Sequence, residues 1–274
     1  MGQALLKMHE FSVEDLFVPN SKISKEVMWG VQLVTLSLVY VLWTFWPGLE
    51  LIPRPHEIAS ALVKLFATGS LLEEVVTSII LFLTGTFFVL LIGLPLAYLS
   101  RLPGFQPLIE GICTLRYASL YGFTFLFGTI VKDTYSLKIW LLVFGMLPYF
   151  LTSMVDAVKV PEDEIDNGKT LRQSDWEILY HTVIIGRRHK VIEILRQNAA
   201  MGWMMLAMVE AISMGQGGVG TMLVKETKAS RLDAVYAVQV TIFCIGIMCD
   251  YGFKALLLTM CPYKRAINGG LNYE

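Results

Sequence analysis

The sequence predicts an all-α membrane protein that crosses the bilayer about six times. Three observations lead to this fold class. Of the 274 residues, 55% are hydrophobic and only 16% are charged, whereas soluble domains carry about 25% charged residues. The apolar residues form long segments, each of roughly the length that a helix needs to span a bilayer core. The charged residues gather between these segments, and the longest charged segment is residues 160–190.

The predicted spans are segments with few or no charges. They cover residues 27–49, 75–100, 107–131, 139–155, 193–213 and 234–258. The first has tryptophans near both ends, where aromatic rings settle at the membrane interface. Glycine and proline inside membrane helices are tolerated when neighbours satisfy the backbone, but Pro148 is expected to break the fourth span.

Shorter polar segments connect these spans. Pro53 and Pro55 precede apolar residues at helical spacing, which predicts a helix along the membrane surface from about His56. Residues 5–18 could form a second surface helix, and a frayed terminus explains them equally well. The end of the chain, residues 266–274, is expected to be disordered.

The distribution of lysine and arginine predicts the orientation. Six spans place both termini and residues 159–190 on one side, which carries 13 of the 22 cations when Lys254 near the end of the last span is counted with the tail, against 7 on the other. Cytoplasmic loops carry the excess of Lys and Arg. We therefore expect a multi-pass protein of the plasma (inner) membrane with a cytoplasmic N-terminal segment, 1–26, a membrane domain, 27–258, and a cytoplasmic tail, 259–274.

No pattern indicates an enzyme or a cofactor site. The four cysteines and four histidines lack metal-ligand spacing, and the net charge of −1 gives no indication of nucleic acid binding. The glycine-rich run MGQGGVG, from Met214, lacks the GK[ST] of a phosphate-binding loop, so a flexible external loop is predicted instead.

The charged segment, residues 160–190, reads as two short helices. Acidic residues after Pro161 favour a helix start, and Asn167-Gly168 is expected to turn the chain. Ser174 and Glu177 form the pattern of a capping box at the second helix.

Trp176, Leu179 and Val183 follow the capping box at helical spacing. Such an apolar stripe could dock into a groove of a partner. It could equally pack on the protein's own membrane helices, and the pattern leaves both interpretations open.

The charged segment resembles a loop of one transporter family. VPEDEIDNGKTLRQSDW, Val160 to Trp176, is similar to the loop before the penultimate span in permeases of binding-protein-dependent ATP-binding-cassette (ABC) importers, which contains Glu-Ala-Ala and, further on, Gly. Asp166 to Gly168 occupy the Glu-Ala-Ala positions, and Arg172 stands at the family glycine. A rival register uses Glu162, Gly168 and Ile178 but loses the tryptophan match.

The resemblance covers most of the chain, from about Leu51 to Arg265. The Pro-x-Pro entry to the surface helix, the run Gly93 to Ala97 and the segment Gly202 to Leu223 are similar to the nitrate/sulfonate/taurine/bicarbonate group of these permeases. Within the last segment Glu210 and Gly220 are in register.

The resemblance implies a type I ABC importer permease fold and a transport function. The chain would form the pathway for a small anionic solute and work by alternating access. The implied partners are cytoplasmic ATPase subunits, a second permease subunit, identical or different, and an extracytoplasmic substrate-binding protein. ATP and magnesium would bind to the ATPase, and this chain would bind no cofactor. The resemblance leaves nitrate, bicarbonate, a sulfonate and a pyrimidine open as substrates.

The resemblance also implies which residues would contact the ATPase. Leu171 and Trp176 would be apolar anchors, and the polar contacts would come from the same stretch of the charged segment. The full predicted set is Glu162, Glu164, Asp166, Gly168, Leu171, Arg172, Ser174 and Trp176.

Charged residues inside predicted spans are candidates for the substrate pathway, because such charges are costly and functional by default. Arg116 and Glu210 could pair with each other, or Arg116 could face an anion. Tyr117 and Tyr121, one helical turn apart, could line the same helix face. These four residues are the predicted pathway set.

Other functions stay open. Arg172 in place of glycine could mark a specialised, non-conducting or heterodimeric subunit. A self-contained secondary transporter usually shows an internal repeat, which the chain lacks. A membrane-embedded enzyme would need clustered polar groups, and the chain's intramembrane charges are scattered.

Overall fold

The computed structural model describes residues 25–45, 53–160 and 162–260, and these are helical with short connections. Two compact units divide the chain, Met1–Glu57 and Ile58–Glu274. The prediction for residues 5–18 and nearly all of the predicted tail lie outside the described residues. The predicted first span is helix α1 (Lys25–Phe45), which has an apolar stretch from Met28 to Val41.

Helix α2 (Pro55–Ala67) begins at a proline, which suits the first helical turn. The predicted surface helix is therefore present as a helix. Gly69, with φ of 72°, separates α2 from α3 (Ser70–Leu99). At about 1.5 Å per residue, the 30 residues of α3 are long enough to cross a bilayer.

The predicted third span is not one helix. It is divided into α4 (Gln106–Thr114), a 3-10 turn η2 (Leu115–Tyr117) and α5 (Leu120–Ile130). Ala118 and Ser119 between them have extended backbone. An apolar run alone does not reveal such an interruption, which is why the single-helix prediction was wrong.

Helix α6 (Thr134–Val158) is continuous through Pro148, contrary to the predicted break. The proline sits in a helix that is buried over much of its length, where neighbouring helices hold the backbone. By length and composition, α3, α6 and α11 (Leu232–Met260) could each cross a membrane.

The charged segment forms α7 (Glu162–Thr170), α8 (Asp175–Ile178) and a π-helical stretch η3 (Leu179–Ile185). It leads into α9 (Arg188–Ile212), which starts five residues before the predicted fifth span. The glycine-rich run, predicted as a flexible loop, leads directly into a helix, because α10 (Val219–Lys228) begins within its last two residues.

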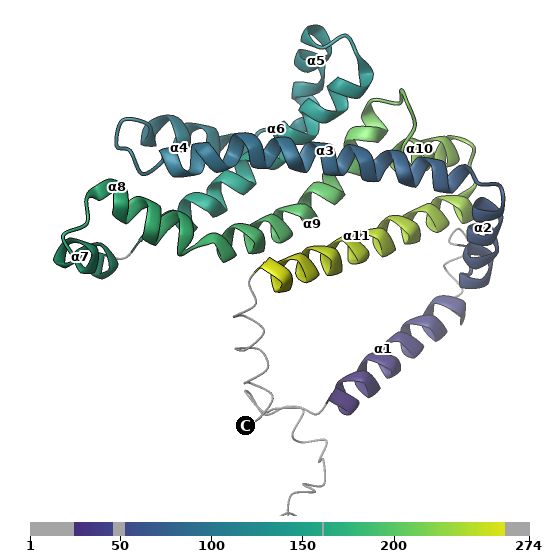
Figure 1. Ribbon diagram of the computed structural model, residues 1–274. Helices are drawn as coiled ribbons and strands as arrows, with labels where there is room; N and C mark the ends of the chain where they lie inside the picture. Colours follow the sequence, from purple (N-terminus) through teal and green to yellow (C-terminus); the bar gives the residue numbers. More distant parts are fainter. Residues whose placement is uncertain (1–24, 46–52, 161, 261–274) are drawn as a thin grey trace, which may run out of the picture. The chain divides into compact units, whose positions relative to one another are not determined.

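The core of the second unit lies along α6, which packs between α3 and α9, while α9 also packs against α11 (Figure 1). Phe82 of α3 meets Trp203 of α9 edge to face, with ring centroids 5.5 Å apart. The Trp203 indole N–H donates to the carbonyl of Ile242 at 2.8 Å. A Cβ at Gly85 would lie 2.6 Å from the side chain of Leu142, so this glycine lets α3 and α6 approach closely.

Candidate functional site

The charged segment folds into a hairpin of α7 and α8, called here the α7–α8 hairpin (residues 162–178). The chain turns at Leu171 to Gln173, and not at the predicted Asn167-Gly168, which lies inside α7. The Gln173 N–H donates to the carbonyl of Gly168 at 3.1 Å, and the Arg172 N–H donates to that of Lys169 at 2.9 Å. These two bonds are those of a Schellman motif, which ends many helices.

Arg172 occupies the left-handed position of this motif, with φ of 58°. Glycine is the usual residue there because a Cβ clashes in that conformation. A non-glycine residue in the left-handed region costs about 1–2 kcal/mol. Arg172, which the sequence resemblance aligns with a family glycine, thus has a left-handed backbone in this chain.

The predicted capping box is confirmed. The Ser174 hydroxyl accepts from the Glu177 N–H, and the Glu177 carboxylate accepts from the Ser174 N–H at 2.7 Å. These bonds to Ser174 lower the pKa of Glu177, because they stabilise its charged form. Behind the cap, a Cβ at Gly168 would lie 2.7 Å from Ile178, so the glycine allows α7 and α8 to pack tightly.

The tip of the hairpin exposes large apolar side chains. Leu171 is 72% exposed and Trp176 is 67% exposed. Val183, the third member of the predicted stripe with Trp176 and Leu179, is buried. The stripe thus divides, with its inner end packed in the protein and Trp176 open to a partner.

Arg187 attaches the hairpin to the membrane helices. Its guanidinium donates to the carbonyls of Ala157 and Lys159 at 3.0 and 2.9 Å, at the end of α6, and pairs with Glu164 of α7 at 3.2 Å. The other end of the hairpin runs through η3 into α9. The hairpin is therefore bonded to the end of α6 and continuous with α9.

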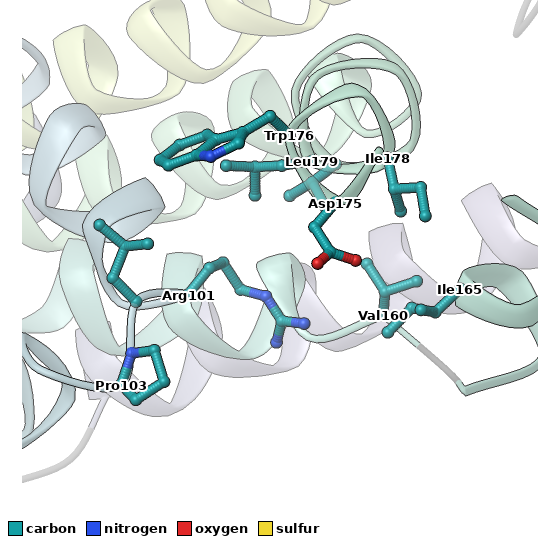
Figure 2. A pocket seen from close by; sticks show the side chains of 10 residues that line it. Arg101, Pro103, Val160, Ile165, Asp175, Trp176, Ile178 and Leu179 are labelled. Atoms are coloured by element: carbon teal, nitrogen blue, oxygen red, sulfur yellow. The ribbon is translucent and has the colours of Figure 1, made fainter. Parts of the chain in front are cut away.

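A pocket of about 360 Å³ lies beside the hairpin. Figure 2 shows Arg101 and Pro103, from the turn between α3 and α4, across the pocket from Trp176 of the hairpin and Leu179 of η3. The α3–α4 turn and the hairpin thus share one surface.

The break between α4 and α5 faces the middle of α6. The Tyr149 hydroxyl donates to the carbonyl of Arg116 at 3.2 Å, and Tyr149 lies nine residues before the end of α6, which is roughly 14 Å along a helix. The Arg116 guanidinium donates to the Tyr117 hydroxyl at 2.7 Å. Tyr117 and Tyr121 are 77% and 70% exposed, but they lie in different helical segments, so the expected single helix face is absent.

Arg116 and Glu210 do not pair in the described part of the chain. Glu210 is fully buried and accepts from the Ser78 hydroxyl at 2.6 Å and the Gly220 N–H at 2.8 Å. An ion pair of Arg196 and Asp250, at 2.6 Å, instead joins α9 to α11. Arg196 and Asp250 are 54 residues apart, so their positions in the sequence do not predict this pair.

The glycine-rich run is fixed by side chains from three helices. The carboxylate of Glu74 accepts from the Gly218 N–H, Ser78 accepts from the Val219 N–H at 2.9 Å, and the buried Lys138 donates to the carbonyl of Gly217 at 2.7 Å. We call this group, residues 213–220 with Glu74, Ser78, Lys138 and Glu210, the glycine clasp.

The carboxylates of Glu74 and Glu210 thus accept hydrogen bonds from backbone N–H groups at the start of α10, where negative charge is favourable. The prediction of a flexible loop was wrong for this reason. Lys138, Glu74 and Ser78 were missed, because they sit at the edges of apolar runs and resemble ordinary span boundaries. Within the described residues, no group of histidines, cysteines and carboxylates could hold a metal ion.

The class of protein follows from comparison with known proteins. The fold is that of an ABC transporter permease: the chain is similar to the MetNI methionine ABC transporter in an inward-facing conformation, with a TM-score of 0.59 and 14% identity over 69% of this chain and 95% of that one. No protein-family model matches the sequence.

Two curated relatives agree with this class over most of the chain. A putative ABC transporter permease protein of Methanocaldococcus jannaschii is 23% identical, covering 84% of this chain and 90% of the relative. The taurine transport system permease protein TauC of Escherichia coli K12 is 22% identical, covering 84% of this chain and 88% of the relative. The chain is thus a membrane protein related to ABC transporter permeases, as the sequence resemblance predicted. These relatives are transporter permeases and not enzymes.

Proposed function

We propose that the chain is the permease subunit of an ATP-driven importer of a small anionic solute. It supplies the pathway and passes on the movement of separate ATPase subunits, which bind ATP and magnesium. A second permease subunit completes the pathway, and a substrate-binding protein delivers the solute. The relatives' names and the fold support the permease class. The α7–α8 hairpin is the observation that supports coupling of this chain to the ATPase subunits.

The hairpin has the features of a helical element that docks into a groove. Leu171 and Trp176 are largely exposed on it, and tryptophan is among the residues that contribute most to binding energy at protein interfaces. Arg187 ties its base to α6, so a rotation of the docked tip moves the membrane helices. Through these features, closure of the ATPase subunits would move the membrane helices and so change the side from which the pathway is accessible.

The cation distribution supports a cytoplasmic hairpin, with both termini on the same side. A cytoplasmic location is also where ATP is available. The plasma membrane is the expected location, because importers that take solutes from a binding protein lie there.

The break at Ala118 and Ser119 supports a pathway or a second subunit beside α5. Extended backbone at membrane depth is tolerated only where it is covered by protein or lines a water-filled cavity, because lipid cannot satisfy its polar groups. The exposed side chains next to the break, above all Tyr117, Tyr121 and Phe125, therefore need protein or water as neighbours.

Arg116 lies at this break and supports an anionic solute. Its guanidinium presents several donors in a fixed plane that suits carboxylate-like, sulfonate or nitrate oxygens. The relative from Escherichia coli is named for taurine transport, and taurine carries a sulfonate group, which agrees with this class. Replacing Arg116 by Ala is expected to abolish uptake in proteoliposomes while the ATPase stays bound, and Arg116→Lys is expected to retain part of the uptake.

The docking test uses a double variant, Leu171→Ala with Trp176→Ala. Loss of both anchors is expected to release the ATPase subunit from the purified complex and to abolish transport. The matched control, Phe66→Ala with Leu72→Ala, removes exposed apolar side chains from α2 and α3 and is expected to retain the ATPase. If the double variant still holds the ATPase and transports normally, the docking assignment is wrong.

A further inference from the structure

Arg172 combines three properties. It holds the left-handed position of the Schellman motif, it lies at the exposed tip of the α7–α8 hairpin, and its side chain is charged. Glycine would build the same turn without the steric penalty. The turn therefore gives no reason for an arginine, so the side chain itself must supply one.

Contacts among the residues that the structure describes do not supply that reason. Among the described residues, the Arg172 side chain forms none of the ion pairs or hydrogen bonds, whereas the neighbouring Lys169 lies 4.0 Å from Asp166. A cation held at a strained backbone position with no partner in the described chain indicates a function outside it.

The surroundings indicate where that function lies. Leu171 precedes Arg172 and Trp176 follows four residues later, and both are largely exposed. Arg172 is thus continuous with the apolar surface proposed to enter the ATPase groove. A guanidinium carried into such a groove loses water and needs a carboxylate partner, for which its planar, bidentate geometry is well suited.

We propose that Arg172 is a specificity-determining contact that pairs with an acidic side chain in the groove of the ATPase subunit. This inference rests on the proposed function. The pair selects an ATPase with a carboxylate at that point and disfavours one without it, because a buried unpaired charge is costly. Arg172 thereby restricts this permease to a matching ATPase.

The proposal predicts that stability and binding change in opposite directions when Arg172 becomes glycine. Arg172→Gly relieves the backbone strain, so the isolated permease unfolds at a higher temperature than the parent chain. The same substitution removes the guanidinium, so the affinity for the ATPase falls on the order of tenfold, the loss expected for one charge-assisted hydrogen-bonded pair. If Arg172 had only a structural role, the substitution would lower both the unfolding temperature and the affinity for the ATPase, or neither.

The experiment measures both quantities in nanodiscs, with the ATPase subunit that co-purifies with the parent chain as the probe. Arg172→Lys keeps the charge without the bidentate geometry and is expected to bind between the parent chain and Arg172→Gly. Arg172→Glu is expected to bind weakest. Lys169→Ala removes a cation from the same hairpin and is the matched control, expected to bind like the parent chain.

The outcomes separate this inference from the proposed function. If no ATPase subunit co-purifies with the parent chain, the proposed function fails and takes the inference with it. If the parent chain holds its ATPase and Arg172→Gly binds it equally well, only the inference is overturned. If Lys169→Ala weakens binding as much as Arg172→Gly, general charge attraction explains the effect and the specific pair is overturned.

Discussion

The glycine clasp and the α7–α8 hairpin both depend on left-handed backbone, but they satisfy it in different ways. The clasp places Gln216, Gly217 and Gly218 in that region, and side chains of Lys138 and Glu74 bond the backbone of the two glycines. The hairpin uses Arg172, exposed and without a partner in the described chain. The hydrogen-bonded turn of the clasp joins helices of the fold to one another. The exposed turn at Arg172 leaves a charged side chain available to a partner.

The largest expected effect comes from removing the buried cation of the clasp. Lys138→Met leaves the carbonyl of Gly217 without its donor and the buried Glu210 without its nearby positive charge. Losing one partner of a buried charge group costs about 3 kcal/mol or more. The free energy of unfolding in detergent should fall by that amount, and protease should cut within residues 213–218.

The control is Lys225→Met, which removes an exposed lysine 3.9 Å from Glu74. Exposed pairs contribute less than about 1 kcal/mol. Equal losses for the two variants would mean that the clasp is not the fixed region that its hydrogen bonds indicate.

Overpacking the hairpin should have a smaller effect. Gly168→Ala pushes a methyl group against Ile178 and is expected to lower the free energy of unfolding by about 1–3 kcal/mol. It should also weaken ATPase binding, because α7 and α8 separate. Gly104→Ala, where no atom lies within 4 Å of the added Cβ, should change neither quantity.

Removing the cap of α8 is expected to cost about 1 kcal/mol, the usual value for an N-cap serine. Ser174→Ala should increase hydrogen exchange of the Glu177 amide, whose acceptor is lost. Exchange in the glycine clasp should stay unchanged. Faster exchange in both regions would contradict their independence.

The smallest effect is a dependence on pH. Because its folded pKa lies below the ordinary 4.5, Glu177 stabilises the hairpin fully above pH 4.5, and this contribution disappears as the pH falls through the lowered value. The difference in unfolding temperature between the parent chain and Glu177→Ala should therefore shrink on acidification. A difference that grows as the pH falls would contradict the capping assignment.

The sequence predicted the parts of the fold that depend on local pattern. Long apolar runs locate α3, α6 and α11, and the Ser174–Glu177 spacing locates the capping box, because each signal lies within a few turns of one helix. The relation to ABC permeases was also predicted from local motifs. Whether the predicted coupling and pathway residues act as proposed remains a prediction.

Contacts between distant segments could not be predicted in this way. Glu210 is bonded to Ser78, which is 132 residues away in sequence, and Arg196 is bonded to Asp250, which is 54 residues away. Beside the break at Ala118–Ser119, the Arg116 carbonyl is bonded by Tyr149 of α6, and the apolar sequence around the break resembles an unbroken span. The turn at Arg172 was missed because Asn167-Gly168 is the stronger local turn signal, yet Gly168 is needed inside α7 for packing against Ile178.

The central claim, that the hairpin is the cytoplasmic surface that binds the ATPase, can be tested by labelling one cysteine in each compared region. In a chain whose own cysteines are replaced, Thr170→Cys marks the exposed tip of the hairpin and Met214→Cys marks the exposed end of the clasp. With an impermeant maleimide, Cys at 214 should react in intact cells. Cys at 170 should react only in inside-out vesicles, and bound ATPase should protect it. Labelling of both from the same side, or no protection by the ATPase, would contradict the account.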